Sequence, residues 1–306
     1  MASLKHSIFS ALDASFESGR SKHSDMHNNI NTKEHIYSYK QLNNLRDLSS
    51  NFVAYCKENN IKKMGKLNPE VAKSFLESKR SEGVSEQTIK VYRSELDKIG
   101  VLMSNFYNRK IDLKVENLEP KAQAKDSEKI RTIAVSNRDY ERLLASKTRL
   151  SESKMGVILS RNFGLRVSEV CHLRPCDVSE KGIQIVQSKG GRDRYIPVRT
   201  EEQRAVIRQL QSNFGANKLP EERYFKTKQN SMNRWFQNGM KRLGINYYAE
   251  HKTGFHALRK AYATDYYNEL RADGKSHRQA WDEVSENLGH GRGREDLFRV
   301  YVVKSR

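Results

Sequence analysis

Apolar residues recur at steps of three and four along the first third of the chain. From about residue 34 to 110 they form three stripes separated by polar turns. Asn68-Pro69 opens the second stripe and Ser85 precedes the third. An Asn or Ser side chain accepts a free amide N–H at a helix start, and proline fits the first helical position. This pattern predicts a small all-α domain at 34–110. Its predicted inward face comprises Leu42, Leu45, Phe52, Val71, Phe75, Leu76, Ile89, Tyr92, Leu96, Ile99, Met103 and Phe106.

Polar segments lie on either side of this domain. Residues 1–33 are rich in Ser, Asn, His and Lys, with one weak apolar patch around Ile8 and Leu12. They are compatible with either an ordered lead-in helix or a flexible arm. Residues 111–129 become polar and charged around Pro120, which is typical of a linker. We therefore expect a polar N-terminal extension at 1–33, a linker at 111–129 and a second domain at 130–306.

The second domain begins with helical segments. Ser136 with Asp139 resembles a capping box. A further helix breaks near Gly164, and the next starts around Arg166 and must stop before Pro175. Later helices are expected at roughly 200–211, 231–243, 256–270 and 276–287, followed by a last turn that carries Tyr301.

A different period interrupts these helices. Residues 183–186 and 195–198 predict two short strands joined by a glycine-rich hairpin turn at 188–193. The predicted fold class is therefore mainly α with a small β-sheet, in which an N-terminal helical domain precedes a mixed α/β domain.

The charge of the chain indicates a polyanionic partner. The chain has 56 Lys and Arg against 37 Asp and Glu, a formal net charge of +19, and the excess is spread along the chain. Neutralising phosphates releases condensed counterions, so nucleic acid is the natural partner for such a surface. A solvated basic surface that only maintains solubility is the alternative.

Other classes of protein are disfavoured. No stretch approaches the roughly 20 apolar residues that a membrane span requires, and the first residues do not resemble a secretion signal. The three cysteines, Cys56, Cys171 and Cys176, include no metal-type CxxC pair. We expect a cytoplasmic, DNA-associated protein with reduced, structural cysteines.

Two Arg-containing pairs suggest chemistry on a phosphodiester. Arg166 and Glu169 are three apart, as are His256 and Arg259, so each pair shares a helix face. Either pair alone is more typical of an ordinary helix surface. Attack on a phosphodiester needs cations at its oxygens, a nucleophile in line and an acid for the leaving oxygen.

The ordered set resembles the tyrosine recombinases of the lambda-integrase and Xer type, the phage integrase family. Residues 164–170 (Gly-Leu-Arg-Val-Ser-Glu-Val), with Leu173-Arg174, match the first box of that family. His256-Ala-Leu-Arg259 matches the second, and Leu288-Gly-His290 with Tyr301 matches the third. Ser188-Lys189-Gly190-Gly191 ahead of Tyr195-Ile196-Pro197 resembles the hairpin that holds the family's lysine.

The resemblance implies a role for each position. Arg166 and Arg259 clamp the scissile phosphate, Tyr301 attacks it to form a 3′-phosphotyrosyl link, and Lys189 protonates the leaving 5′ oxygen. Lys181 is a weaker competitor for that last role. His256 assists proton transfer or orientation, His290 hydrogen-bonds the phosphate, and Glu169 supports Arg166. No cofactor is implied, and neither metal nor ATP is needed.

The resemblance also implies an architecture and partners. The helical domain corresponds to the family's core-binding (SAM-like) domain and residues 130–306 to its catalytic domain. Four protomers act on two duplexes with specific core sites, through a Holliday junction, with possible accessory DNA-bending or directionality proteins. Integration or excision of a mobile element is favoured over Xer-like dimer resolution by the polar extension at 1–33. Type IB topoisomerase-like or telomere-resolving activity is the enzymatic rival, and a catalytically silent DNA-binding regulator is the rival from another class.

Two features depart from the family pattern. His290 and Tyr301 are eleven residues apart, a longer spacing than is usual, and Gly291–Arg294 resembles a short insertion. Tyr301 is the only tyrosine after His290, so it remains the candidate nucleophile. Five residues follow it, where many relatives carry a longer C-terminal helix, which leaves open how protomers interlock.

Overall fold

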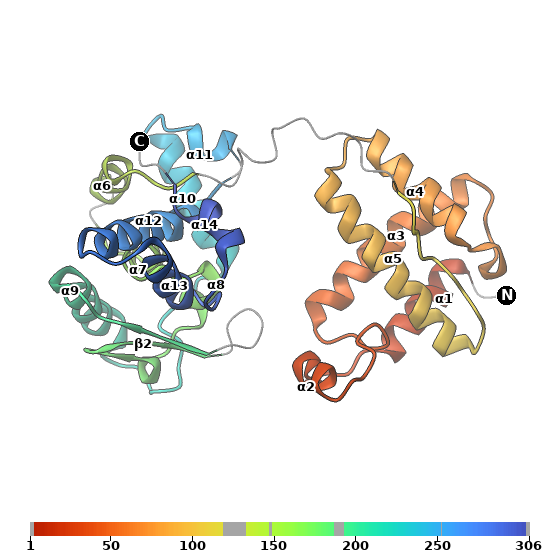
Figure 1. The fold of residues 1–306 in the computed structure, drawn as a ribbon, viewed down its shortest axis with the longest axis horizontal. Helices are drawn as coiled ribbons and strands as arrows, with labels where there is room; N and C mark the ends of the chain where they lie inside the picture. Colours follow the sequence, from red (N-terminus) through yellow and green to blue (C-terminus); the bar gives the residue numbers. More distant parts are fainter. Residues whose placement is uncertain (1–2, 119–132, 147–148, 187–192, 252, 304–306) are drawn as a thin grey trace. The chain divides into compact units, whose positions relative to one another are not determined.

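The structure, a computed structural model, describes residues 3–118, 133–146, 149–186, 193–251 and 253–303. The chain divides into two compact units, Met1–Gln123 and Ala124–Arg306, coloured red to yellow and yellow-green to blue (Figure 1). The architecture is helical apart from one three-stranded sheet in the second unit. The predicted fold class, mainly α with a small β-sheet, is confirmed. No helix within the described ranges is long and apolar enough to cross a membrane.

The first unit is a helical bundle around one apolar core. Asn68 and Ser85 cap α4 and α5 as predicted, each accepting a backbone N–H three residues on. The core joins apolar residues of α1, α3, α4 and α5 with the segment that follows α5. The helices are α1 (Leu4–Ala14), α2 (Lys22–His27), α3 (Tyr39–Glu58), α4 (Pro69–Ser81) and α5 (Glu86–Tyr107), with a 3-10 turn at Met64–Lys66.

Residues at the start of the chain belong to this core. Ile8 and Leu12 of α1 are fully buried, and α1 packs on α3 and α5. The buried Lys98 Nζ donates to the carbonyls of Thr32 and His35, and burial lowers its pKa to about 8. Of the two alternatives for residues 1–33, the described part therefore has the ordered helix.

The predicted inward stripe of α5 is wrong at its end. Phe106 is 46% exposed, whereas Ile89, Leu96, Ile99 and Met103 are buried. The neighbouring Tyr107 turns toward α1 instead, and its hydroxyl donates to the Ser7 carbonyl over 3.1 Å. Adjacent residues on a helix point about 100° apart, so Phe106 faces outward.

In the second unit, a central helix is surrounded by other helices. Helix α7 packs against α8, α9, α10 and α12. The capping box before α6 is present in part, since Ser136 accepts the Asp139 N–H. The helices are α6 (Asn137–Ala145), α7 (Glu152–Phe163), α8 (Val167–His172), α9 (Glu201–Leu210), α10 (Gln229–Arg242), α11 (Tyr247–Glu250), α12 (His256–Ala272), α13 (His277–Asn287) and α14 (Glu295–Tyr301).

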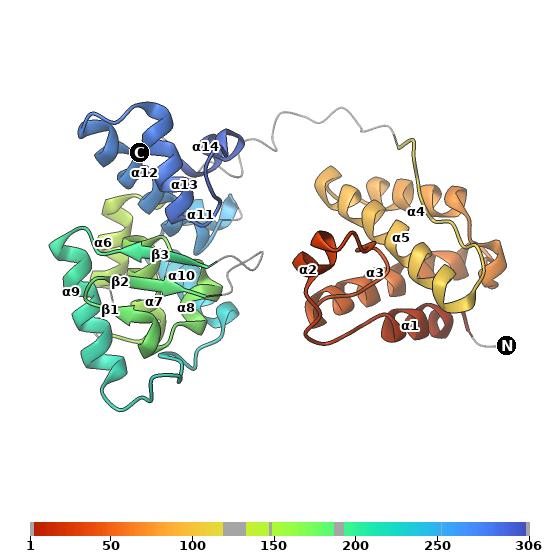
Figure 2. The same cartoon turned by 60° about the horizontal axis from the view of Figure 1, so that its bottom comes forward.

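The sheet is antiparallel in the order β1–β2–β3 (Figure 2). Strand β2 (Gly182–Ile185) pairs with β3 (Arg194–Pro197), and Ile183 lies opposite Ile196. The sequence pattern missed β1 (Val178–Ser179), which is only two residues long, and the single turn of α11. The predicted glycine-rich turn lies mostly outside the described residues. All three cysteines are free; Cys56 and Cys171 are buried, whereas Cys176 is exposed.

Gly164 ends α7 in a conformation that side chains disfavour. Its φ is +65°, and a Cβ there would lie 2.4 Å from Cδ1 of Tyr262. Gly274 has a similar φ of +85° but no atom within 4 Å of its Cβ position. A side chain at either glycine would strain the backbone, but only a side chain at Gly164 would also clash with a neighbour.

We expect Gly164→Ala to destabilise the second unit by roughly 2–4 kcal/mol, from left-handed strain plus overpacking. Gly274→Ala should lose only the strain, about 1–2 kcal/mol. Both tryptophans, Trp235 and Trp281, lie in this unit, so urea unfolding followed by tryptophan fluorescence reports on it selectively. Equal losses in the two variants would contradict the clash.

Candidate active site

Five of the predicted catalytic residues lie together in the second unit. Arg166 precedes α8, His256 and Arg259 occupy the first turn of α12, His290 follows α13, and Tyr301 ends α14. The Tyr301 ring centre lies 5.4 Å from that of His256 and 4.9 Å from that of His290. The guanidinium carbon of Arg259 is 5.6 Å from the Tyr301 ring centre. The phenol is thus surrounded by nitrogen-bearing side chains.

Lys189 lies outside the described residues, as does most of the turn that carries it. The flanking strands are described, and Ile185 of β2 pairs with Arg194 of β3 at the end where this turn begins and ends. Lys181 precedes β2 at the opposite end of the hairpin, where its carbonyl accepts the Val198 N–H.

Glu169, predicted to support Arg166, is at the centre of the ionic contacts. Its Oε1 is 2.7 Å from Nη1 of Arg166, and both carboxylate oxygens accept from Arg194, over 2.8 and 2.7 Å. Arg259 Nη1 lies 3.9 Å away. Burial would raise the pKa of this carboxyl, but hydrogen bonds from Arg194 and the charges of the three arginines hold it well below its usual range. Glu169 is therefore ionised.

The Glu169 carboxylate also fixes the entry into α8. It accepts the backbone N–H of Arg166 over 2.8 Å, as the third helical residue of a capping box does. The Glu169 carboxylate therefore binds both the backbone N–H and the guanidinium of Arg166. In the part of the chain that the structure describes, no three His, Cys, Asp or Glu side chains are grouped so as to hold a metal ion.

Arg259 is completely buried and is held by the ends of two helices. Its Nη1 donates to the carbonyl of Gly164, which caps α7, and its Nη2 to that of Leu288, which caps α13. The last carbonyls of a helix lack intrahelical partners and carry partial negative charge. Burial lowers the pKa of Arg259 to about 10, so it stays charged at neutral pH. Its Nε has no hydrogen-bond partner among the described residues.

Arg194 is a residue of this site that the motif analysis did not identify. Besides its two bonds to Glu169, its Nε donates to the carbonyl of Asn287 over 2.8 Å, which ties β3 to α8 and α13. The predicted strand at 195–198 begins one residue too late to include Arg194; in β3, Arg194 and Ile196 occupy alternate positions and so share a face. An arginine on the face of a buried isoleucine needs an acidic partner.

Both histidines of the site are neutral at pH 7 in the DNA-free protein. For His290, burial and then the charges of Arg259 and Arg166 lower the pKa to about 3. His256 is exposed at its surface edge, yet protein atoms packed around its ring, then the charges of Arg259 and Lys260, also lower its pKa. The Nε2 of His290 lies 3.4 Å from Nη2 of Arg259. Neutral imidazoles can each donate one hydrogen bond and accept another.

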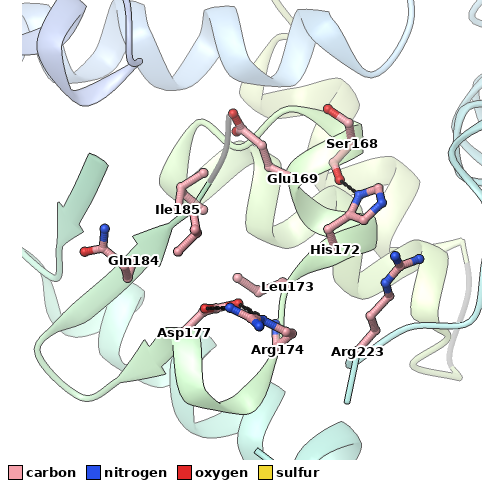
Figure 3. A pocket seen from close by; sticks show the side chains of 10 residues that line it. Ser168, Glu169, His172, Leu173, Arg174, Asp177, Gln184, Ile185 and Arg223 are labelled. Atoms are coloured by element: carbon pink, nitrogen blue, oxygen red, sulfur yellow. Dashed lines mark hydrogen bonds and ion pairs between the residues drawn. The ribbon is translucent and has the colours of Figure 1, made fainter. Parts of the chain in front are cut away.

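A pocket of about 550 Å³ is lined in part by Glu169, and Figure 3 shows the side chains around it. Glu169 lines it from the catalytic side, and His172, Arg174 and Arg223 contribute basic side chains. Arg174 is paired with Asp177 over 2.9 Å, and Nδ1 of His172 lies 2.7 Å from the Ser168 carbonyl. Val186, the last described residue before the Lys189 segment, also lines the pocket. The pocket is therefore next to the catalytic cluster and does not contain it.

The lowered pKa of His290 makes the second unit sensitive to acid. The unfolded chain binds a proton at this histidine below about pH 6.5, whereas the folded chain does so only near pH 3. Stability is therefore complete above pH 6.5 and falls as the pH falls toward 3.

When the pH is lowered from 7.5 to 5.5, we expect the free energy of unfolding of the wild type to fall by about 1 kcal/mol more than that of His290→Gln. Urea unfolding followed by tryptophan fluorescence at the two pH values measures this difference. The exposed His172, changed to Gln, serves as the control for the same substitution outside the cluster. A wild-type dependence in His290→Gln would show that His290 does not titrate abnormally.

Two sequence comparisons indicate the kind of protein to which this chain is similar. Residues 134–275 match the sequence model of the phage integrase family. The tyrosine recombinase XerA of Thermococcus kodakarensis is 28% identical over 207 residues, which cover 65% of this chain and 68% of that protein.

Two solved structures share the fold. A XerH site-specific recombinase bound to palindromic difH substrate has a TM-score of 0.65 at 14% identity, covering 99% of this chain and 91% of that one. A lambda integrase tetramer bound to a Holliday junction has a TM-score of 0.63 at 14% identity, covering 96% and 79%. The predicted recombinase architecture is confirmed. Over residues 134–275 the chain is similar to the phage integrase family, and its sequence and fold are similar to those of tyrosine recombinases, the enzymes that break and rejoin DNA in site-specific recombination.

Proposed function

We propose that Tyr301 is the nucleophile that cleaves DNA, with Arg166, Arg259, His256 and His290 acting on the scissile phosphate. The observation that carries the proposal is the position of the Tyr301 ring between the two imidazoles and the buried Arg259 guanidinium. The phenol oxygen attacks phosphorus, and the bond from phosphorus to the 5′ oxygen breaks. The 3′-phosphotyrosyl link conserves the bond energy, so rejoining needs no ATP.

The excess positive charge of the site supports phosphate binding. Three guanidinium groups surround one carboxylate, so these four residues together carry a net charge of +2. A phosphodiester brings one negative charge, and further negative charge develops on its oxygens as attack proceeds. Fixed donors aimed at such developing charge are the largest single source of catalysis in many enzymes.

The neutral histidines suit proton transfer next to these cations. His256 in its neutral form can accept the phenolic proton as Tyr301 attacks, and His290 can donate a hydrogen bond to a phosphate oxygen. A bound phosphate raises both pKa values again, because its negative charge offsets that of the arginines. Glu169 and Arg194 act indirectly, by holding the Arg166 guanidinium in place.

Lys189 is the proposed acid for the 5′ oxygen, and the hairpin geometry favours it over Lys181. Arg194, which bonds Glu169, lies at the hairpin end from which the Lys189 segment extends. Lys181 lies at the other end of β2, four residues before Ile185, which corresponds to about 13 Å along the strand. The strand ends to which the Lys189 segment is joined lie beside the site, and this supports Lys189 as the acid.

The DNA arrangement is proposed from the relatives. The lambda integrase structures hold a dimer on a COC′ core site and a tetramer on a Holliday junction. We propose the same for this chain, core-site DNA and four protomers in synapsis, and add from the family resemblance accessory proteins that bend DNA or set direction. Because α1 is packed into the first unit, residues 4–14 do not form a free arm. The basis for preferring integration over Xer-like resolution is thereby weakened, and attachment repeats beside the gene would decide.

We expect Tyr301→Phe to bind core-site DNA with near-normal affinity and to form no covalent adduct, because it loses the nucleophile but no cation. A suicide substrate nicked near the cleavage point traps the adduct for detection on a denaturing gel. Tyr267→Phe, which removes a hydroxyl bonded to His277 on the neighbouring helix, should still form it. An adduct with Tyr301→Phe would move the nucleophile elsewhere and refute the proposal.

We expect Lys189→Ala to cleave normal DNA slowly, because the 5′ oxygen then leaves without a proton. A substrate with sulfur in place of that oxygen has a leaving group that hardly needs protonation, so Lys189→Ala should recover most of its rate on it. Arg259→Ala should remain impaired on both substrates. Equal defects of Lys189→Ala on oxygen and sulfur would leave this lysine as a DNA contact only.

A further inference from the structure

The backbone on both sides of Tyr301 is bound to one side chain, that of Thr264. Its hydroxyl donates to the Tyr301 carbonyl over 3.2 Å and accepts the Val303 N–H over 3.1 Å. Thr264, Tyr301 and Val303 are 4%, 5% and 7% exposed. Water therefore cannot readily replace these bonds, and the segment that carries the phenol is closed onto α12.

The need for such a partner follows from the end of α14. This helix has seven residues and ends at Tyr301, after which Val302 is extended, with φ −95° and ψ 108°. The last carbonyls of a helix have no intrahelical partner. Thr264 supplies a donor to the Tyr301 carbonyl and so terminates the helix at the nucleophile itself.

Thr264 also links the nucleophile to the phosphate-binding arginine. It lies five residues after Arg259 on the same helix, α12. The opposite end of α14 is held separately: the Trp281 indole donates to the Arg294 carbonyl over 2.9 Å, and Nε2 of His277 lies 3.1 Å from Oε1 of Glu295. The C-terminal end of α14 therefore depends on α12 for its position relative to Arg259.

We propose that Thr264 is a positioning residue of the cleavage reaction, whose hydroxyl holds the Tyr301 backbone at a set distance from Arg259 within one chain. This inference rests on Tyr301 being the nucleophile. Without the hydroxyl, the Tyr301 carbonyl and the Val303 N–H lose a shared partner, and the end of α14 can shift. A displacement of about 1 Å in a reacting group can reduce a rate on the order of 100-fold.

The test compares Thr264→Val with Thr264→Ser in the full-length protein. Valine keeps the shape and removes the hydroxyl, whereas serine keeps the hydroxyl and removes the methyl group. Single-turnover cleavage of the nicked suicide substrate is measured at saturating DNA, together with DNA affinity and the urea midpoint. We expect Thr264→Val to cleave on the order of 10- to 100-fold more slowly with unchanged DNA affinity. Thr264→Ser should lie within about threefold of wild type, since serine supplies the same two bonds.

The control removes an equivalent hydroxyl elsewhere in the same unit. Thr227 donates to Glu152 over 2.6 Å at the start of α10, away from α12 and α14, so Thr227→Val should lose stability but keep the wild-type cleavage rate. If Thr264→Val does not fold, a chain ending at Val302 removes the Val303 N–H and should also cleave at least about threefold more slowly at saturating DNA. Three results would each overturn the proposal. The first is a smaller loss of cleavage rate than expected in whichever of these variants folds. The others are an equal loss of rate in Thr227→Val and a Thr264→Ser rate well below that of wild type. An adduct with Tyr301→Phe would instead refute the nucleophile assignment.

Discussion

A single buried carboxylate holds the catalytic centre together. Glu169 binds Arg166 and Arg194 directly and lies within ion-pair distance of Arg259. A buried charge that loses its partner destabilises a protein by several kcal/mol, so loss of this carboxylate would weaken the contacts of all three arginines. Because Arg194 also bonds the end of α13, the carboxylate connects the sheet, α8 and α13 as well as the arginines. The position of the Arg166 guanidinium, one of the proposed phosphate-binding groups, depends on this contact.

Helix ends supply the rest of the site. Arg259 rests on the terminal carbonyls of α7 and α13, and Glu169 lies in the first turn of α8. Helix ends are suited to this because their unpaired backbone groups provide fixed dipoles that need no rearrangement during the reaction. Gly164 is required here for a geometric reason, since its left-handed conformation turns the chain from α7 into the Arg166 segment.

Local signals in the sequence predicted most of the fold and the described motif residues of the site. Asn68 and Ser85 mark helix starts through chemistry confined to a few neighbouring residues, and the caps form as expected. The missing parts depend on long-range contacts. Arg194 meets Glu169 across 25 positions and Thr264 meets Val303 across 39, distances over which periodicity carries no information. The inward position predicted for Phe106 is wrong for a related reason, because the orientation of this part of α5 depends on a contact that Tyr107 makes with α1.

The complete burial of Arg259 has a consequence for the stability of the second unit. A buried guanidinium has lost its hydration, and the Gly164 and Leu288 carbonyls and the nearby Glu169 carboxylate stabilise its charge in place of water. A phosphodiester bound at the proposed site adds a further negative charge beside it, and a ligand that binds the folded state alone stabilises that state. We therefore expect the affinity for DNA and the free energy of unfolding of this unit to rise and fall together.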